Sequence, residues 1–121
     1  MTDYTVSCHI LNSNKGLPLS DILCELYLIT DSGNIKVAQQ KTNKDGRVPK
    51  ESWEYIGDKR ITHSNTYMIR FQIKSSYYDL VNEDTLYPYI DIPFMIKESA
   101  VHHYHIPLLL NNFGYTTYRG S

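Results

Sequence analysis

Histidines are concentrated in one short stretch of this chain. Of the five, at positions 9, 63, 102, 103 and 105, three fall within four residues in VHHYHIPLLL. Side chains alternate along a strand, so His103 and His105 would share one face while His102 would point the other way. Imidazole changes charge near neutral pH, and such a cluster could move protons in a hydrolytic reaction. We expect His63 and His102 to be ordinary surface residues.

Hydrolysis by water needs a base and a group that stabilises the developing oxyanion. Histidine could be the base, and Arg47 follows an Asp-Gly turn in TNKDGRVP, where a long cationic side chain can reach sideways. No Gly-x-Ser-x-Gly elbow, phosphate loop or dinucleotide fingerprint occurs. Cys8 falls on the apolar side of its predicted strand, so we expect a buried hydrophobe there. Direct attack by water is therefore the predicted chemistry.

A zinc site is the lesser alternative for the same histidines. His-x-His on one strand face is a spacing that metal ligands use. The strand contains no Cys, Asp or Glu, so a metal would need His9 from another strand. We expect no metal and no other cofactor. In a zinc protein, His103 and His105 would be essential and Arg47 dispensable.

The elements that position these residues are predicted to be strands. Runs rich in tyrosine and β-branched residues alternate in polarity along most of the chain. In YTVSCHIL the even positions are apolar, so His9 should face away from the core. Further strands are predicted over 22–30, 35–42, 66–74, 87–96, 102–110 and 115–118, and 31–34 should form a tight hairpin. About seven or eight strands predict an all-β sandwich, with one short helix over 75–84 that Ser75 or Ser76 would cap.

Length and charge limit the organisation and the partners. The chain has 121 residues, which predicts one domain over 1–121. Its net charge of -1 provides no electrostatic footprint for nucleic acid or an anionic membrane, so we expect neither partner. Two cysteines and the lack of any apolar run of about 20 residues favour a reducing, cytoplasmic location, or a peroxisomal one in a eukaryote. We expect no cleavable amino-terminal signal.

Four segments in order resemble the transthyretin-related proteins, the 5-hydroxyisourate hydrolases of urate breakdown, over nearly the whole chain. They are SCHILNSNKGLPLSD, TNKDGRVP, HYHIPLL and the ending FGYTTYRGS. The first two are weak signals, since such short patterns arise by chance, and the last two are highly specific. The chain departs from the family pattern at Asn12, where the family commonly has Asp, and at NNFG, where it often has Ser-Pro before the aromatic residue.

The resemblance implies a fold, a reaction and a set of site residues. The family forms a transthyretin-like β-sandwich that assembles into homotetramers with active sites in a channel between dimers. The implied reaction is hydrolysis of 5-hydroxyisourate to 2-oxo-4-hydroxy-4-carboxy-5-ureidoimidazoline, a step of purine metabolism. The implied catalytic residues are His9, Arg47 and His105, and the implied substrate-binding residues are His9, Arg47, Tyr118, Arg119, Gly120 and Ser121.

The final tetrapeptide is expected to be a wall of the site. The Tyr118 hydroxyl and the backbone of the last residues would bind the amides of the ring, and Gly120 would permit a tight bend. The Arg119 side chain itself is expected to be a solvated charge, and His103 a neighbour that orients the site.

Two further classes of protein remain open besides the enzyme and the zinc protein. A small-molecule carrier of the transthyretin type would use the same channel, but it would need an apolar lining where this chain has His9, His105 and Tyr118. A structural or interaction sandwich would show no clustering of titratable groups.

Overall fold

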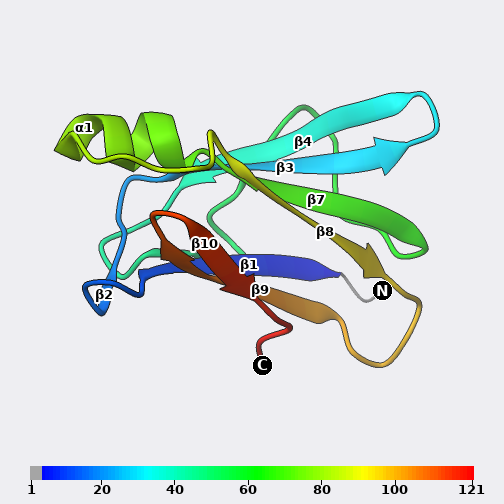
Figure 1. Cartoon of the computed structure of the whole chain (residues 1–121). Helices are drawn as coiled ribbons and strands as arrows, with labels where there is room; N and C mark the ends of the chain where they lie inside the picture. Colours follow the sequence, from blue (N-terminus) through cyan, green and yellow to red (C-terminus); the bar gives the residue numbers. More distant parts are fainter. Residues whose placement is uncertain (1–3) are drawn as a thin grey trace.

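The computed structural model describes residues 4–121, which form two β-sheets and one short helical segment (Figure 1). Its strands are β1 (Thr5–Asn12), β2 (Leu17–Pro18), β3 (Leu23–Thr30), β4 (Gly33–Lys41), β5 (Arg47–Val48), β6 (Glu54–Tyr55), β7 (Asn65–Phe71), β8 (Ile90–Ile96), β9 (His103–Asn111) and β10 (Gly114–Thr117). A π-helical turn (Lys74–Tyr78) leads into α1 (Asp79–Val81). No helix in this described part is long and apolar enough to span a membrane.

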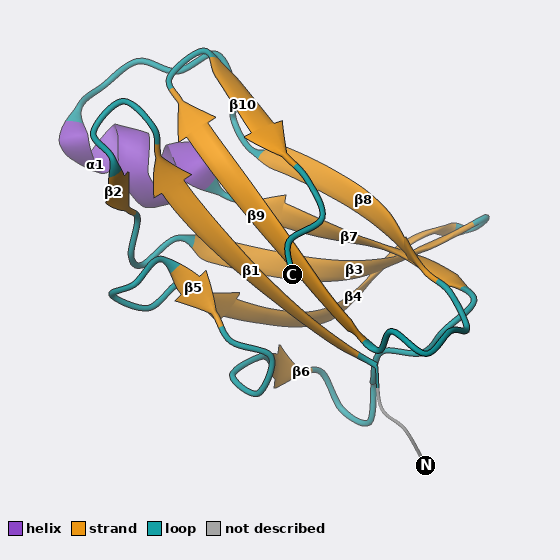
Figure 2. Cartoon of the chain, turned by 90° about the horizontal axis from the view of Figure 1, so that it is seen from below, coloured by secondary structure: helices purple, strands orange, loops and turns teal. Residues whose placement is uncertain are grey.

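The two sheets stack face to face, as the all-β prediction required (Figure 2). One has the strand order β10-β9-β1-β2, and β5 also pairs with β1, while the other has the order β6-β4-β3-β7-β8. Within residues 4–121 there are ten strands against the seven or eight expected. The excess comes from β2, β5 and β6, which have two residues each and are too short to show alternation.

The parallel pairing of β1 with β9 brings the two ends of the sequence together. The register runs from Thr5 opposite His103 to Asn12 opposite Leu110. On β1, Val6, Cys8 and Ile10 are fully buried, so the alternation predicted for this strand is confirmed. The opposite face of β1 and β9 carries the polar side chains and points away from the second sheet.

The core lies between the sheets and draws side chains from both. Its fully buried large members are Tyr67, Tyr78, Phe71, Ile10, Ile22, Leu26, Ile69, Ile73, Ile90, Ile96, Leu108 and Leu110. Trp53 covers one end, and its indole Nε1 donates a hydrogen bond of 2.9 Å to the carbonyl of Val6. This bond satisfies a buried donor and fixes the loop after β5 against β1.

The helical segment is where predicted, but the expected serine cap is wrong. The residue at the N-cap is Ile73, and no side chain caps the turn. The Ser76 hydroxyl instead accepts a hydrogen bond of 3.2 Å from the backbone N–H of Leu23 at the start of β3. That hydroxyl satisfies a strand donor, which is a tertiary contact that local sequence cannot reveal.

Candidate active site

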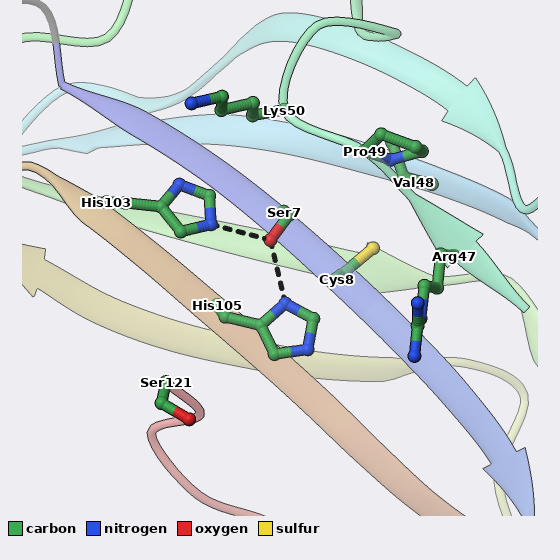
Figure 3. A pocket seen from close by; sticks show the side chains of 9 residues that line it. All are labelled: Ser7, Cys8, Arg47, Val48, Pro49, Lys50, His103, His105 and Ser121. Atoms are coloured by element: carbon green, nitrogen blue, oxygen red, sulfur yellow. Dashed lines mark hydrogen bonds between the residues drawn. The ribbon is translucent and has the colours of Figure 1, made fainter.

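Two adjacent strands carry the polar cluster on their outward faces. Because β1 and β9 pair in parallel, Ser7 lies opposite His105 and Thr5 lies opposite His103. The same alternation places His9 on this face, two residues beyond Ser7 on β1. Side chains about 98 positions apart in sequence thus meet at one surface, as Figure 3 shows for Ser7 and the two histidines.

Hydroxyl groups and imidazoles alternate across this surface in a hydrogen-bonded chain. The Thr5 Oγ1 lies 2.7 Å from His103 Nδ1, and His103 Nε2 lies 3.0 Å from Ser7 Oγ. Ser7 Oγ also lies 2.7 Å from His105 Nδ1. The hydrogen bond between Ser7 and Nδ1 therefore fixes the orientation of the His105 ring. Its Nε2 is turned toward the side of the hollow where Arg47 lies (Figure 3).

The Asp-Gly turn places Arg47 beside His9. The Asn43 side-chain oxygen accepts hydrogen bonds from the backbone N–H groups of Asp45 and Arg47, at 2.9 and 3.0 Å. Gly46 adopts a φ of +75°, and a Cβ there would lie 2.6 Å from the carbonyl oxygen of Ile10, so only glycine fits against β1. The turn then enters β5, in which Arg47 pairs with His9.

The structure thus brings together the three residues predicted to be catalytic. The rings of His9 and His105 have centroids 6.5 Å apart and planes inclined by 24°. Arg47 is exposed, and its side chain forms no hydrogen bond or ion pair to another group in residues 4–121. Its guanidinium is consequently available to a ligand.

A hollow of about 460 Å³ lies over this surface. Its volume is in the usual range for small-molecule sites. The residues that line it are Ser7, Cys8, Arg47, Val48, Pro49, Lys50, His103, His105 and Ser121 (Figure 3). Six of these nine residues have polar or cationic side chains, so the hollow can bind a polar or anionic ligand with hydrogen-bonding edges.

Burial and neighbouring positive charge favour neutral imidazoles at this surface. The pKa of His105 is lowered below 6.5 by burial and then by His9, His103 and Arg47. The pKa of His9 is lowered by burial and by Arg47, with smaller opposing effects from Asp45. At neutral pH these side chains can therefore accept a proton, as a general base must.

The end of the chain folds back onto His105. The backbone N–H of Gly120 donates a 2.9 Å hydrogen bond to the carbonyl of His105, and the two residues form an isolated β-bridge. A Cβ on Gly120 would lie 2.5 Å from His105 Cδ2. A larger residue would be resisted here, as expected, because the backbone passes directly over the imidazole; no left-handed φ is involved.

The tetrapeptide does not place all its side chains in the hollow. Ser121 lines it, whereas Tyr118 and Arg119 line a separate hollow of about 280 Å³ next to Tyr104 and β8. Arg119 is exposed, as expected of a solvated charge, and its guanidinium also lies over the Tyr104 ring at 4.4 Å. Tyr118 and His105 therefore line different hollows.

Sequence reasoning missed three residues at this surface, namely Thr5, Ser7 and Lys50. Thr5 and Ser7 share the outward face with His9, so strand alternation was a signal that could have found them. Lys50 lines the hollow and helps burial to lower the pKa of His103. It lies in a loop, where periodicity gives no direction.

The geometry does not favour the zinc alternative. Among the described residues, no group of three or more His, Cys, Asp or Glu side chains is arranged to hold a metal ion. The nitrogens of His103 and His105 that face each other are both engaged by Ser7.

Comparison with protein families agrees with this arrangement. The family model described as HIUase/Transthyretin matches residues 6–120. The chain belongs to the HIUase/Transthyretin family. A similar family member is the probable 5-hydroxyisourate hydrolase of Schizosaccharomyces pombe, 36% identical over 119 residues that cover 96% of this chain and 90% of that protein.

Solved structures in the HIUase/Transthyretin family share the sandwich. The structure of Klebsiella pneumoniae 5-hydroxyisourate hydrolase aligns with a TM-score of 0.75 at 23% identity, covering 98% of this chain and 99% of that one. Sea bream transthyretin in complex with thyroxine aligns with a TM-score of 0.81 at 21% identity, covering 96% and 94%. At these identities the likeness establishes the transthyretin-like fold alone.

Proposed function

We propose that this protein is a 5-hydroxyisourate hydrolase that opens the six-membered ring of its substrate with water. The observation that carries the proposal is that Arg47 and His105 line one hollow while His9 lies beside both of them, paired with Arg47 and 6.5 Å from the His105 ring. Relatives named 5-hydroxyisourate hydrolase that match nearly the whole chain support the same assignment.

The histidines supply the proton transfers of the reaction. A water held between His9 and His105 loses a proton to a neutral imidazole as its oxygen bonds to the ring carbonyl carbon. The carbon–nitrogen bond of the cyclic amide then breaks, and the departing nitrogen takes up the proton from the imidazolium. Lowered pKa values keep the imidazoles unprotonated and ready at neutral pH.

Arg47 stabilises the negative charge that develops on the carbonyl oxygen and binds the polar edge of the substrate. Its side chain lines the hollow and forms no ion pair within residues 4–121, so this contact replaces none there. A guanidinium offers several donors in fixed geometry, which suits an oxyanion or a planar amide edge.

The tetrapeptide closes the site at the side of His105. Gly120 rests on the imidazole, and Ser121 reaches the hollow, so both are proposed to contact the substrate through backbone and hydroxyl groups. Tyr118 and Arg119 support this tail, with Arg119 packed on Tyr104 and bonded to the carbonyl of His103 at 3.5 Å. Direct contact of Tyr118 with substrate would require assembly to change its surroundings.

Assembly into a homotetramer is part of the proposal. Strands β8 and β10 are neighbouring outer edges of the two sheets, as Figure 2 displays, and unpaired edges are templates for pairing with another chain. Light scattering after size exclusion would give the mass directly. We also propose a reducing, cytoplasmic location, which suits the buried free thiols Cys8 and Cys24 and can be tested by microscopy of a tagged protein.

The deciding experiment generates 5-hydroxyisourate in situ with urate oxidase and follows its ultraviolet absorbance. The intact protein should accelerate the decay, and His105→Ala and a chain lacking residues 118–121 should both lose that acceleration. Unchanged spontaneous decay with the intact, folded protein would refute the hydrolase. Thyroxine binding would then test the alternative of a transthyretin-like carrier, which the polar lining of the hollow disfavours.

A further inference from the structure

Ser7 has an unusual position between two imidazoles. Its Oγ lies 3.0 Å from His103 Nε2 and 2.7 Å from His105 Nδ1, and the residue is only 9% exposed. A serine hydroxyl has one proton to donate, whereas it can accept more than one hydrogen bond. It therefore cannot donate to both rings, and the protonation of one ring constrains that of the other.

Two arrangements of neutral rings satisfy every member of the chain. In the first, Thr5 donates to His103 Nδ1, and His103 Nε2–H donates to Ser7. Ser7 then donates to His105 Nδ1, so His105 carries its own proton on Nε2. In the second, all directions reverse: His105 Nδ1–H donates to Ser7, Ser7 donates to His103 Nε2, and His103 Nδ1–H donates to Thr5. Only the second leaves the Nε2 of His105 with a free lone pair.

Electrostatics favours the second arrangement. The Nε2 of His105 faces the side of the hollow where Arg47 lies (Figure 3). An N–H directed at this side would place its positive end toward the guanidinium, while a lone pair places its negative end there. The Nδ1–H is instead directed away from the cation, toward a neutral hydroxyl that can accept it.

We propose that Ser7 is a positioning residue that selects the tautomer of His105, with Thr5 and His103 completing the chain that fixes the direction of the Ser7 hydroxyl. Ser7 accepts the Nδ1–H of His105 and so holds the unprotonated Nε2 toward the hollow. The tautomer of a histidine is generally set by the partner of its other ring nitrogen, and here that partner is a hydroxyl where many enzymes use a carboxylate.

The consequence for catalysis rests on the proposed function. The water proton passes to His105 Nε2, and the imidazolium keeps its Nδ1–H on Ser7, so no hydrogen bond behind the ring is rearranged. The same proton later leaves Nε2 for the departing nitrogen. A neutral acceptor adds no negative charge behind the ring, which agrees with an imidazole that stays neutral at physiological pH.

The test combines ¹⁵N NMR of the imidazole nitrogens with kinetics of the full chain and its Ser7→Ala and Ser7→Thr variants. In the unaltered protein, His105 should be protonated on Nδ1 and His103 on Nδ1. Ser7→Ala should shift His105 toward the Nε2–H tautomer and lower kcat at least tenfold while KM changes less than threefold, because a general base contributes about 10²–10⁴-fold. Ser7→Thr, which retains the hydroxyl, should restore both the tautomer and most of the rate.

The NMR readout separates this proposal from the proposed function. Thr116→Ala, on the neighbouring strand β10 and exposed, is the matched loss of a hydroxyl and should change neither tautomer nor rate. If His105 carries its proton on Nε2 in the unaltered protein, or if Ser7→Ala leaves its tautomer unchanged, the role of Ser7 is refuted. If the protein fails to hydrolyse 5-hydroxyisourate while the tautomers respond as expected, the function is wrong and the positioning role of Ser7 stands.

Discussion

Gly120→Ala is the sharpest test of the contact between the tail and His105. The added Cβ would lie 2.5 Å from Cδ2, 3.2 Å from Cγ and 3.3 Å from the carbonyl oxygen of His105. Ordinary contact begins at 3.4 Å, so the ring or the tail must move by about 0.9 Å. Cδ2 is bonded to Nε2, and the tail is tied to His105 by a backbone hydrogen bond, so either movement displaces part of the site.

The expected effect is large on catalysis and small on folding. A displacement near 1 Å can cost about 10²-fold in rate, equivalent to about 2.7 kcal/mol of transition-state stabilisation. Gly120 lies outside the core, so the free energy of unfolding should change by less than about 1 kcal/mol. The assay is kcat/KM for 5-hydroxyisourate, paired with a denaturant titration of the same preparation.

Gly114→Ala is the matched control for this prediction. Gly114 begins β10, the strand that leads into the tail, its φ is not in the left-handed region, and a Cβ there would meet its nearest atom, Oδ1 of Asn111, at an ordinary 3.6 Å. This variant should keep the rate of the unaltered protein. If Gly120→Ala is equally active, the approach of the tail to the imidazole has no catalytic role, and the reasoning from the 2.5 Å contact fails.

Three other outcomes are expected. Arg47→Gln should lower kcat by about 10²–10³-fold and leave the free energy of unfolding unchanged within about 0.5 kcal/mol. The control Lys44→Gln, in the same turn, should leave kcat unchanged. Equal activity of the two variants would remove Arg47 from the mechanism. The acid limb of kcat/KM should have its midpoint below pH 6.5, because the pKa of His105 is lowered in the folded protein. The pKa values of His9 and His103 are lowered as well, so on acidification the unfolded chain binds protons before the folded protein does. The free energy of unfolding should therefore fall as the pH drops from 6.5 through the folded pKa values, and then level off. A midpoint above 6.5 would contradict this. Tyr78→Phe should leave the free energy of unfolding unchanged, or raise it by up to about 1 kcal/mol, in a denaturant titration. The reason is that the buried Tyr78 hydroxyl has no hydrogen-bond partner within the described residues, and burial raises its pKa to about 12. A loss of more than about 1 kcal/mol would show that the hydroxyl has a partner.

Local sequence determined the elements and their faces. Alternation in β1 was sufficient to bury Cys8 and to direct His9 to the opposite face, since strand geometry sends successive side chains to opposite sides. The Asp-Gly pair was sufficient to predict the turn before Arg47, because glycine tolerates the left-handed φ that the turn requires. These features depend on neighbours within a few residues.

Only the tertiary structure decided how the site is built. The parallel register of β1 with β9 sets Ser7 against His105, and no local pattern specifies a pairing across 98 residues. The same holds for Gly120, whose reason lies in the imidazole beneath it and not in its own backbone, and for Tyr118, which faces a different hollow from Ser121. Residue types and alternation supplied the chemical groups, and long-range strand pairing determined which groups touch.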